Sequence, residues 1–196
     1  MAPRDKDIKE KIVAAAWELF GEKGYEATTL NDIIARAGIA RGTFYYHFNS
    51  KETLLNTLSV LLDEKYKEIE ETIPADMTAY DKLLYINYYI HSFMGETIDY
   101  NLLANQYAGQ LLRGGDSNLL DRNRYYFKLL AKFIEEGQKK DEIITSMTSS
   151  EIVNYYSMCE RALVTDWCMN NGSYSLGEVS KEYMPLLIGM IRGPKG

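Results

Sequence analysis

Apolar residues recur three or four positions apart along almost the whole chain, which is the spacing of amphipathic α-helices. In the first such segment, one helical face carries Ile8, Ile12, Ala16, Leu19 and Phe20. Only four of the 196 residues are proline, so few positions would interrupt a helix. The pattern predicts an all-α protein with about nine helices.

Short turns separate the predicted helices. Thr29 begins a short helix in which Asp32, three residues further on, completes a capping box, and Gly38 ends that helix. A third helix is expected at about residues 41–47, and a long fourth helix follows, capped by Ser50 and reaching to about residue 69. Five more helices are expected at residues 78–94, 100–112, 119–137, 150–171 and 176–190.

The charge of the chain is unevenly distributed. The whole sequence has 22 basic and 28 acidic side chains, which gives a formal net charge of −6. Residues 1–52 hold eight of each sign, so the excess negative charge lies in the remainder. This distribution argues against a protein that binds polyanions over its whole surface, and it favours the N-terminal end for any contact with one.

Nothing in the sequence indicates export, a membrane anchor or a bound cofactor. The longest charge-free runs, residues 83–95 and 100–112, have 13 residues each and are too short to span a bilayer. Cys159 and Cys168 lie nine residues apart in one predicted helix, on opposite faces, so they cannot form a disulfide. There is no CxxC pair and no histidine spacing suited to a metal. We therefore expect a cytoplasmic protein without a metal or cofactor.

The segment from Thr29 to Lys51 has the spacing of a helix-turn-helix unit, since two short predicted helices meet at Gly38 with a turn of about three residues. In such a unit the second helix enters the major groove of DNA. Short helices joined by glycine turns also occur in helical proteins that bind no DNA, so the spacing alone leaves both alternatives open. Phe44 and Phe48, four residues apart, are expected in the core.

Residues at the start of the second helix suit the reading of base edges. Arg41 can donate a fork of hydrogen bonds to guanine, and Thr43 offers a methyl group to thymine. Gly42 allows the backbone to approach a base. Tyr45, Tyr46 and His47 follow on the same helix.

The polar tips of these three side chains suit phosphate oxygens, which fix the register of a protein on DNA without reading its sequence. Lys51 lies in the first turn of the next predicted helix. Its ammonium group and the unpaired N–H groups of that turn are expected to hold a phosphate together.

The motif closely resembles the DNA-binding domain of TetR-family transcriptional regulators, and the resemblance covers about residues 7–60. The matching positions are Gly24-Tyr25-Glu26-Ala27-Thr28-Thr29, Ile33, Ala37-Gly38, Arg41-Gly42-Thr43-Phe44-Tyr45-Tyr46-His47-Phe48 and Ser50-Lys51-Glu52. Two positions depart from the family pattern. Ala40 replaces a common Ser or Thr that can cap a helix, and Asn49 replaces a common basic residue.

The resemblance implies a homodimer that represses transcription and releases its operator DNA when a small molecule binds. It implies a DNA-binding domain at residues 1–50 and a ligand-binding and dimerisation domain at residues 51–196. The DNA contacts carried over by position are Thr29, Arg41, Gly42, Thr43, Tyr45, Tyr46, His47 and Lys51.

Polar side chains on apolar helix faces mark a candidate ligand pocket. Buried polar groups need partners, and a ligand is one alternative to a neighbouring helix or water. The candidates are Tyr66, Asn87, His91, Gln106, Tyr107, Gln110, Tyr155, Met158 and Cys159. The region has no excess of basic residues, so we expect a neutral or weakly cationic effector that is aromatic or amphipathic.

The last two predicted helices carry apolar stripes that are expected to form a four-helix bundle with the partner subunit. The stripes consist of Leu163, Trp167, Val179, Tyr183, Leu186, Leu187 and Met190. The alternative is that these residues bury against their own domain.

Two other functions compete with that of a ligand-responsive repressor. An enzyme is disfavoured because the chain has no Ser/His/Asp order, no paired carboxylates in an apolar setting, no phosphate-binding glycine loop and no HExxH motif. The second alternative is a related helical protein that acts through a protein partner without specific DNA recognition, which Ala40 and Asn49 would favour.

Overall fold

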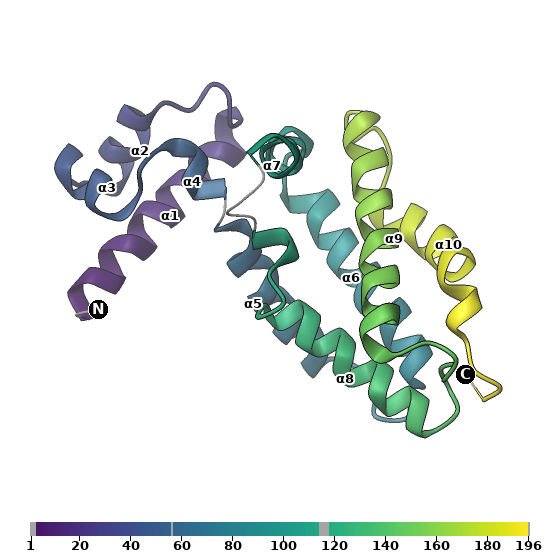
Figure 1. Cartoon of the computed structure of the whole chain (residues 1–196). Coiled ribbons are helices and arrows are strands. Elements are labelled where there is room, and N and C mark those ends of the chain that lie inside the picture. The colour runs from purple at the N-terminus through teal and green to yellow at the C-terminus, as the bar shows by residue number, and fades with distance from the viewer. Residues whose placement is uncertain (1–2, 56, 114–117, 196) are drawn as a thin grey trace.

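A computed structural model describes residues 3–55, 57–113 and 118–195 (Figure 1). These residues form ten α-helices and two 3-10 turns. The described part of the chain has a single isolated β-bridge, between Ile143 and Arg192, and no longer strand. The predicted all-α class is therefore confirmed.

Three helices occupy one end of the molecule: α1 (Pro3–Lys23), α2 (Leu30–Ala37) and α3 (Arg41–His47) (Figure 1). The capping box of α2 forms as expected, because the Thr29 hydroxyl accepts the Asp32 N–H and the Asp32 carboxylate accepts the Thr29 N–H. Gly38 ends α2 in the left-handed conformation, with φ +64°. The predicted bounds of α3 are confirmed.

The prediction of one long fourth helix is wrong, because the helix is interrupted between α4 (Lys51–Leu55) and α5 (Leu58–Glu71). At the break, the Thr57 hydroxyl donates to the Leu54 carbonyl (2.6 Å) and accepts the indole N–H of Trp17 in α1 (2.9 Å). A side chain 40 positions away in sequence therefore fixes this bend, and helical periodicity contains no sign of it. We call α1–α4 the N-terminal unit.

The remaining helices, α5–α10, form the C-terminal bundle. Besides α5, this bundle contains α6 (Ala79–Thr97), α7 (Tyr100–Arg113), α8 (Tyr125–Lys139), α9 (Ser149–Met169) and α10 (Leu176–Ile188). In this bundle α10 packs against α6 and α9, while α8 packs against α5, α6 and α9 (Figure 1). The 3-10 turn η1 (Asn118–Leu120) precedes α8, and η2 (Gly189–Ile191) follows α10.

The stretch predicted as one helix at residues 119–137 is η1, a turn and α8. The turn forms because the Asp121 carboxylate accepts the backbone N–H of Asn123 at 2.9 Å, a local hydrogen bond that competes with helix formation. The other C-terminal helices begin and end within a few residues of their expected bounds.

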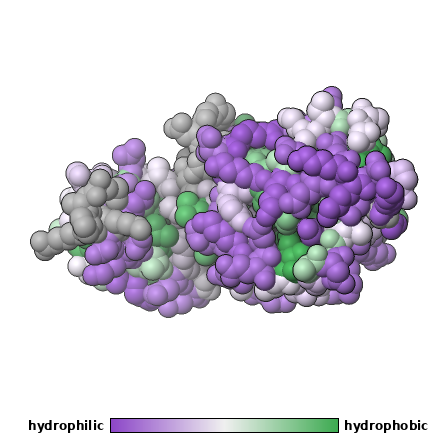
Figure 2. Space-filling view, turned by 90° about the horizontal axis from the view of Figure 1, so that it is seen from below, coloured by the Kyte–Doolittle hydropathy of each residue, from purple (hydrophilic) through white to green (hydrophobic). Residues whose placement is uncertain are grey.

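The face of the molecule seen in Figure 2 is mainly polar. Seen from below, apolar side chains appear on it in separate patches (Figure 2). Among the described residues, no helix combines the length and the apolar character needed to cross a bilayer.

Helices α6 and α10 approach each other most closely at Gly177. A Cβ atom placed there would lie 2.1 Å from Ser92 Oγ and 3.0 Å from Ser92 Cα. We therefore expect Gly177→Ala to lower the free energy of unfolding by about 1–3 kcal/mol, measured by urea denaturation at fixed protein concentration.

Gly189→Ala is the matched control, because a Cβ at Gly189 would meet nothing within 4 Å and its φ of −55° suits any residue. Its stability should stay within about 1 kcal/mol of the parent. Equal stability of the two variants would show that the α6–α10 contact tolerates a methyl group.

Candidate nucleic-acid interface and ligand cavity

Helix α3 presents its polar side chains outward on an apolar anchor. Phe44 is fully buried and Phe48 is 6% exposed, and their rings pack 5.8 Å apart. Tyr45 and Tyr46 are exposed by 45% and 76%. Two large aromatic side chains on a seven-residue helix are therefore available to a partner.

The first turn of α3 is also open. Arg41 and Gly42 are exposed, and Thr43 is partly exposed. A Cβ at Gly42 would meet nothing within 4 Å, so packing within the chain does not require glycine there. Ala40 is the N-cap and makes no side-chain capping bond, as its sequence predicts.

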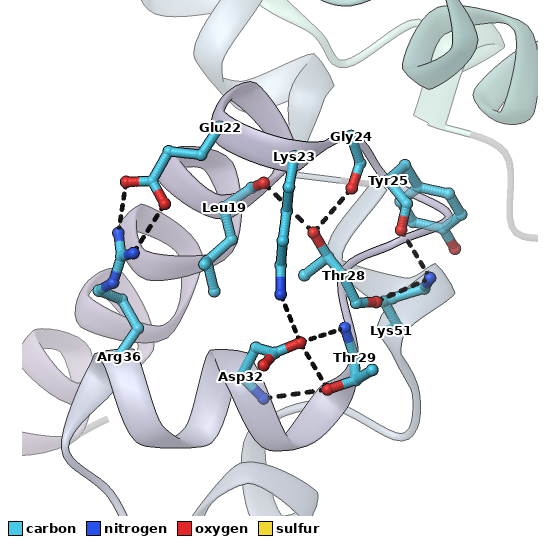
Figure 3. Close-up of polar contacts among 10 residues, drawn as sticks. All are labelled: Leu19, Glu22, Lys23, Gly24, Tyr25, Thr28, Thr29, Asp32, Arg36 and Lys51. Carbon is cyan, nitrogen blue, oxygen red and sulfur yellow. Dashed lines mark hydrogen bonds and ion pairs between the residues drawn. The ribbon is translucent and has the colours of Figure 1, made fainter.

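Charged contacts fasten α2 to α1, and Figure 3 shows those of Arg36 with Glu22 and of Lys23 with Asp32. Arg36 donates two hydrogen bonds to the Glu22 carboxylate, at 2.7 and 2.9 Å. Lys23 donates to Asp32 at 2.7 Å. These contacts hold the capping residue Thr29 in an exposed position at the start of α2.

The structure gives Lys51 an internal role that the sequence did not predict. Its ammonium group donates to the carbonyls of Tyr25 (2.8 Å) and Thr28 (3.1 Å) and lies 4.0 Å from the centre of the Tyr25 ring (Figure 3). Lys51 therefore ties α4 to the loop between α1 and α2, and its donors are directed inward. Because these carbonyls take two of its donors, we propose that the role of Lys51 is structural rather than a contact with phosphate.

We expect Lys51→Met to destabilise the protein, because the ammonium group that bridges the two carbonyls is removed. The free energy of unfolding should fall by about 1.5–3 kcal/mol, the range for hydrogen bonds to charged groups. The salt dependence of DNA binding should keep its slope.

Lys11→Met, at an exposed position of α1, is the control and should change stability by less than about 0.5 kcal/mol. The prediction is contradicted if Lys51→Met keeps the stability of the parent and the slope of the salt dependence falls by about one unit. That result would show that Lys51 contacts a phosphate.

The C-terminal bundle encloses a cavity of about 50 Å³, the inner cavity, whose walls come from α5, α6, α7, η1, α8 and α9 and from Arg124, the N-cap of α8. Four of the nine predicted ligand residues line it: Tyr66, His91, Gln106 and Tyr107. The sequence prediction missed its charged residues, which are Arg124, Glu160 and Arg161.

A larger outer pocket of about 570 Å³ lies between α7, η1 and α9. It includes the predicted residues Gln110 and Met158. Tyr107, Leu119 and Arg161 line both spaces and therefore form the wall between them.

Buried polar groups cluster at the inner cavity around Glu160, which is only 6% exposed. Its carboxylate accepts the amide N–H of Asn87 (3.0 Å) and the hydroxyl of Tyr126. Burial raises the pKa of Glu160 above its ordinary value. Two further acceptor oxygens, Asn87 Oδ1 and Gln106 Oε1, are buried without a hydrogen-bond partner.

Three predicted ligand residues lie outside both spaces. Asn87 reaches the inner cavity only through Glu160. The Tyr155 hydroxyl donates to the Leu187 carbonyl of α10, and Cys159 is buried on α9 with its pKa raised by that burial.

His91, which lines the inner cavity, is paired with Ser180 of α10. Burial lowers the pKa of His91 to about 3, so its imidazole is neutral.

A buried ion pair connects the inner cavity to α5. The Asp63 carboxylate accepts hydrogen bonds from Arg124 Nη2 (2.8 Å), Arg124 Nε (3.2 Å) and the backbone N–H of Tyr125 (3.1 Å). Arg124 also donates to the Ser59 carbonyl. Arg124 therefore joins the wall of the inner cavity to α5, the helix that follows the N-terminal unit.

Most of the predicted dimer residues leave apolar atoms on the surface of α9 and α10. Leu186 and Met190 are exposed by 75% and 60%, and Tyr183 and Leu187 are also exposed. Leu163 and Val179 are partly exposed.

Trp167 differs from the other predicted dimer residues. It is 3% exposed, donates to the Tyr174 carbonyl (2.8 Å) and packs edge-on against Tyr100. Its indole therefore belongs to the core of its own chain, where it stabilises the turn between α9 and α10.

Comparison with known proteins agrees with this arrangement. Residues 12–58, which cover α2–α4 and most of α1, match the family described as bacterial regulatory proteins, tetR family. The fatty acid metabolism regulator protein of Bacillus subtilis is 28% identical over 193 residues, covering 92% of this chain and 94% of that protein. The transcriptional repressor KstR2 of Rhodococcus jostii is 26% identical over 198 residues, covering 95% and 92%.

Solved structures are similar over nearly the full length. The Bacillus subtilis regulator FadR in complex with stearoyl-CoA has 26% identity and a TM-score of 0.67, covering 93% of this chain and 99% of that one. A TetR-family regulator from Pectobacterium atrosepticum shares the fold, with a TM-score of 0.73 at 18% identity and 97% coverage of both chains. The relatives named here are transcriptional regulators, and the chain belongs to the TetR family of DNA-binding transcriptional regulators.

Proposed function

We propose that the protein is a homodimeric repressor that reads an operator with α3 and releases it when a small amphipathic molecule enters the C-terminal bundle. The observation that carries the proposal is the open first turn of α3, where Arg41, Gly42 and Thr43 face outward on a buried phenylalanine anchor. In helix-turn-helix proteins this turn contacts base edges. Such a protein acts where chromosomal DNA lies, in the cytoplasm.

We assign DNA binding to the N-terminal part of the chain, up to about residue 50. The remainder is assigned to effector binding and to dimerisation, in line with the division expected from the sequence. Helix α4, just beyond that position, joins the two parts. Arg41 is the proposed base reader, with Thr43 beside it. Thr29, Tyr45, Tyr46 and His47 are the proposed phosphate contacts.

The size of the outer pocket favours an extended effector. Its volume of about 570 Å³ falls within the range of about 300–1,000 Å³ that small-molecule sites occupy, whereas the inner cavity is much smaller. The solved FadR of Bacillus subtilis holds stearoyl-CoA, which is a long amphipathic molecule. For this chain we propose entry through the outer pocket, with Tyr107, Leu119 and Arg161 moving aside.

The contacts of α5 supply a route from effector to DNA. An effector that extends into the inner cavity would displace Arg124, and with it Asp63 on α5. At the other end of that route, Thr57 is bonded to Trp17 in α1. A shift of α5 would therefore reorient the N-terminal unit, and release requires that the effector bind the reoriented form more tightly.

Selection of binding sites from random duplex DNA at near-physiological salt tests the proposal. We expect an inverted repeat with half-sites about 34 Å apart or somewhat more. Arg41→Ala should lose preference at one base pair of each half-site, at a cost of about 1–3 kcal/mol.

Lys11→Met serves as the control and should select the parent sequence. If folded parent protein enriches no sequence, specific recognition is excluded and the alternative of a protein partner gains support. If Arg41→Ala selects an unchanged half-site, Arg41 is not a base reader.

The exposed stripes of α9 and α10 are the proposed dimer surface. We expect Leu186→Arg to yield a folded monomer by light scattering after gel filtration, because Leu186 is 75% exposed and a charge there would be buried unpaired in the dimer.

Val60→Arg, on α5 with a comparable exposure of 61%, is the control and should remain dimeric. A Leu186→Arg protein that stays dimeric would place the interface elsewhere.

A further inference from the structure

We propose that the effector carries hydrogen-bond donors on the end that enters the inner cavity, with a primary amine on an apolar body as the simplest case. This inference rests on the proposed effector site and specifies its chemistry. It is carried by the buried acceptor oxygens at and near Glu160.

Acceptor oxygens lie in the buried wall of the inner cavity and directly behind it. Glu160 is a carboxylate with only 6% of its surface exposed, and Gln106 Oε1 is buried without a partner. Directly behind Glu160, the Asn87 amide donates an N–H to that carboxylate, and Asn87 Oδ1 is buried without a partner. Buried acceptors without partners are costly, so an entering group that brings donors is favoured.

A primary ammonium group suits these acceptor oxygens because it brings three N–H donors and a positive charge. A carboxylate at the same place would bring only acceptors and would face the Glu160 carboxylate. A plain acyl chain would leave Gln106 Oε1 unpaired.

The positive side chains of the cavity are placed so that they do not reverse this preference. Arg124 is neutralised by Asp63, in an ion pair whose side chains are 9% and 16% exposed. Arg161 lies in the wall shared with the outer pocket and is partly exposed. The cation-binding part of the inner cavity is therefore the Glu160 side, and an acidic or phosphorylated group would be directed outward to Arg161.

The apolar body of the effector has a place in the outer pocket. Leu111, Met158 and Met169 line that pocket and are exposed by 83%, 54% and 76%. The outer pocket adjoins the inner cavity at their shared wall, which suits a molecule with one polar end and one apolar end.

Calorimetric titration of the whole protein with three probes of equal chain length tests the inference: dodecylamine, dodecanoate and lauroyl-CoA, each below its micellar concentration. We expect dodecylamine to bind at least about tenfold more tightly than dodecanoate. Tighter binding of dodecanoate or lauroyl-CoA than of dodecylamine would overturn the inference.

Two variants locate the site. Glu160→Gln should weaken dodecylamine binding by about thirtyfold or more, because the charge partner is lost. Gln106→Leu should weaken it by about tenfold without loss of stability, because it removes an acceptor that has no partner in the unliganded protein. Gln106→Leu keeps the test valid if Glu160→Gln fails to fold.

Glu135→Gln, exposed on α8, is the matched control and should bind dodecylamine like the parent. Parent-like binding by folded Gln106→Leu and Glu160→Gln would overturn the inference and leave Glu160 a purely structural residue. DNA release is measured separately on the selected operator. Dodecylamine that binds through Glu160 without releasing DNA would uphold the inference and contradict the proposed regulation.

Discussion

The partly buried ion pair between Asp63 and Arg124 holds α5 against the start of α8. Asp63 sits on α5, the helix that leaves the N-terminal unit, and its carboxylate also accepts the N–H of Tyr125 at the start of α8. Removing either charge would leave the other partly buried without its opposite charge, which is unfavourable. The same helix, α5, begins next to Thr57, whose hydroxyl accepts the indole N–H of Trp17 in α1.

The same ion pair lies at the edge of the inner cavity, because Arg124 is one of its walls. In the proposed mechanism, effector binding and the orientation of the DNA-reading helix would share Arg124. A regulator needs such a link, since a ligand shifts an equilibrium only through contacts that differ between the two states. The proposed link runs from Arg124 to Asp63 by hydrogen bonds, along α5 to Thr57, and by a further hydrogen bond to Trp17.

Features that depend on neighbouring residues in the sequence were predictable. The capping box of Thr29 and Asp32, the left-handed Gly38 and the bounds of α3 all follow from interactions within a few positions. Lys51 shows where that reasoning ends. Its place in the motif predicted a phosphate contact, yet its partners are carbonyls 23 and 26 positions earlier, which only the folded loop brings to it.

Periodicity, caps and a short local pattern are sufficient to specify the helical class, the DNA-binding motif and the outward face of α3. Folding was needed to reveal the interruption before α5, the burial of Trp167 in its own chain and the charged wall of Arg124, Glu160 and Arg161. Each of these features is a contact between segments that lie far apart in the sequence. Helical spacing reports which face is apolar, but it does not report which polar group of another helix will meet that face.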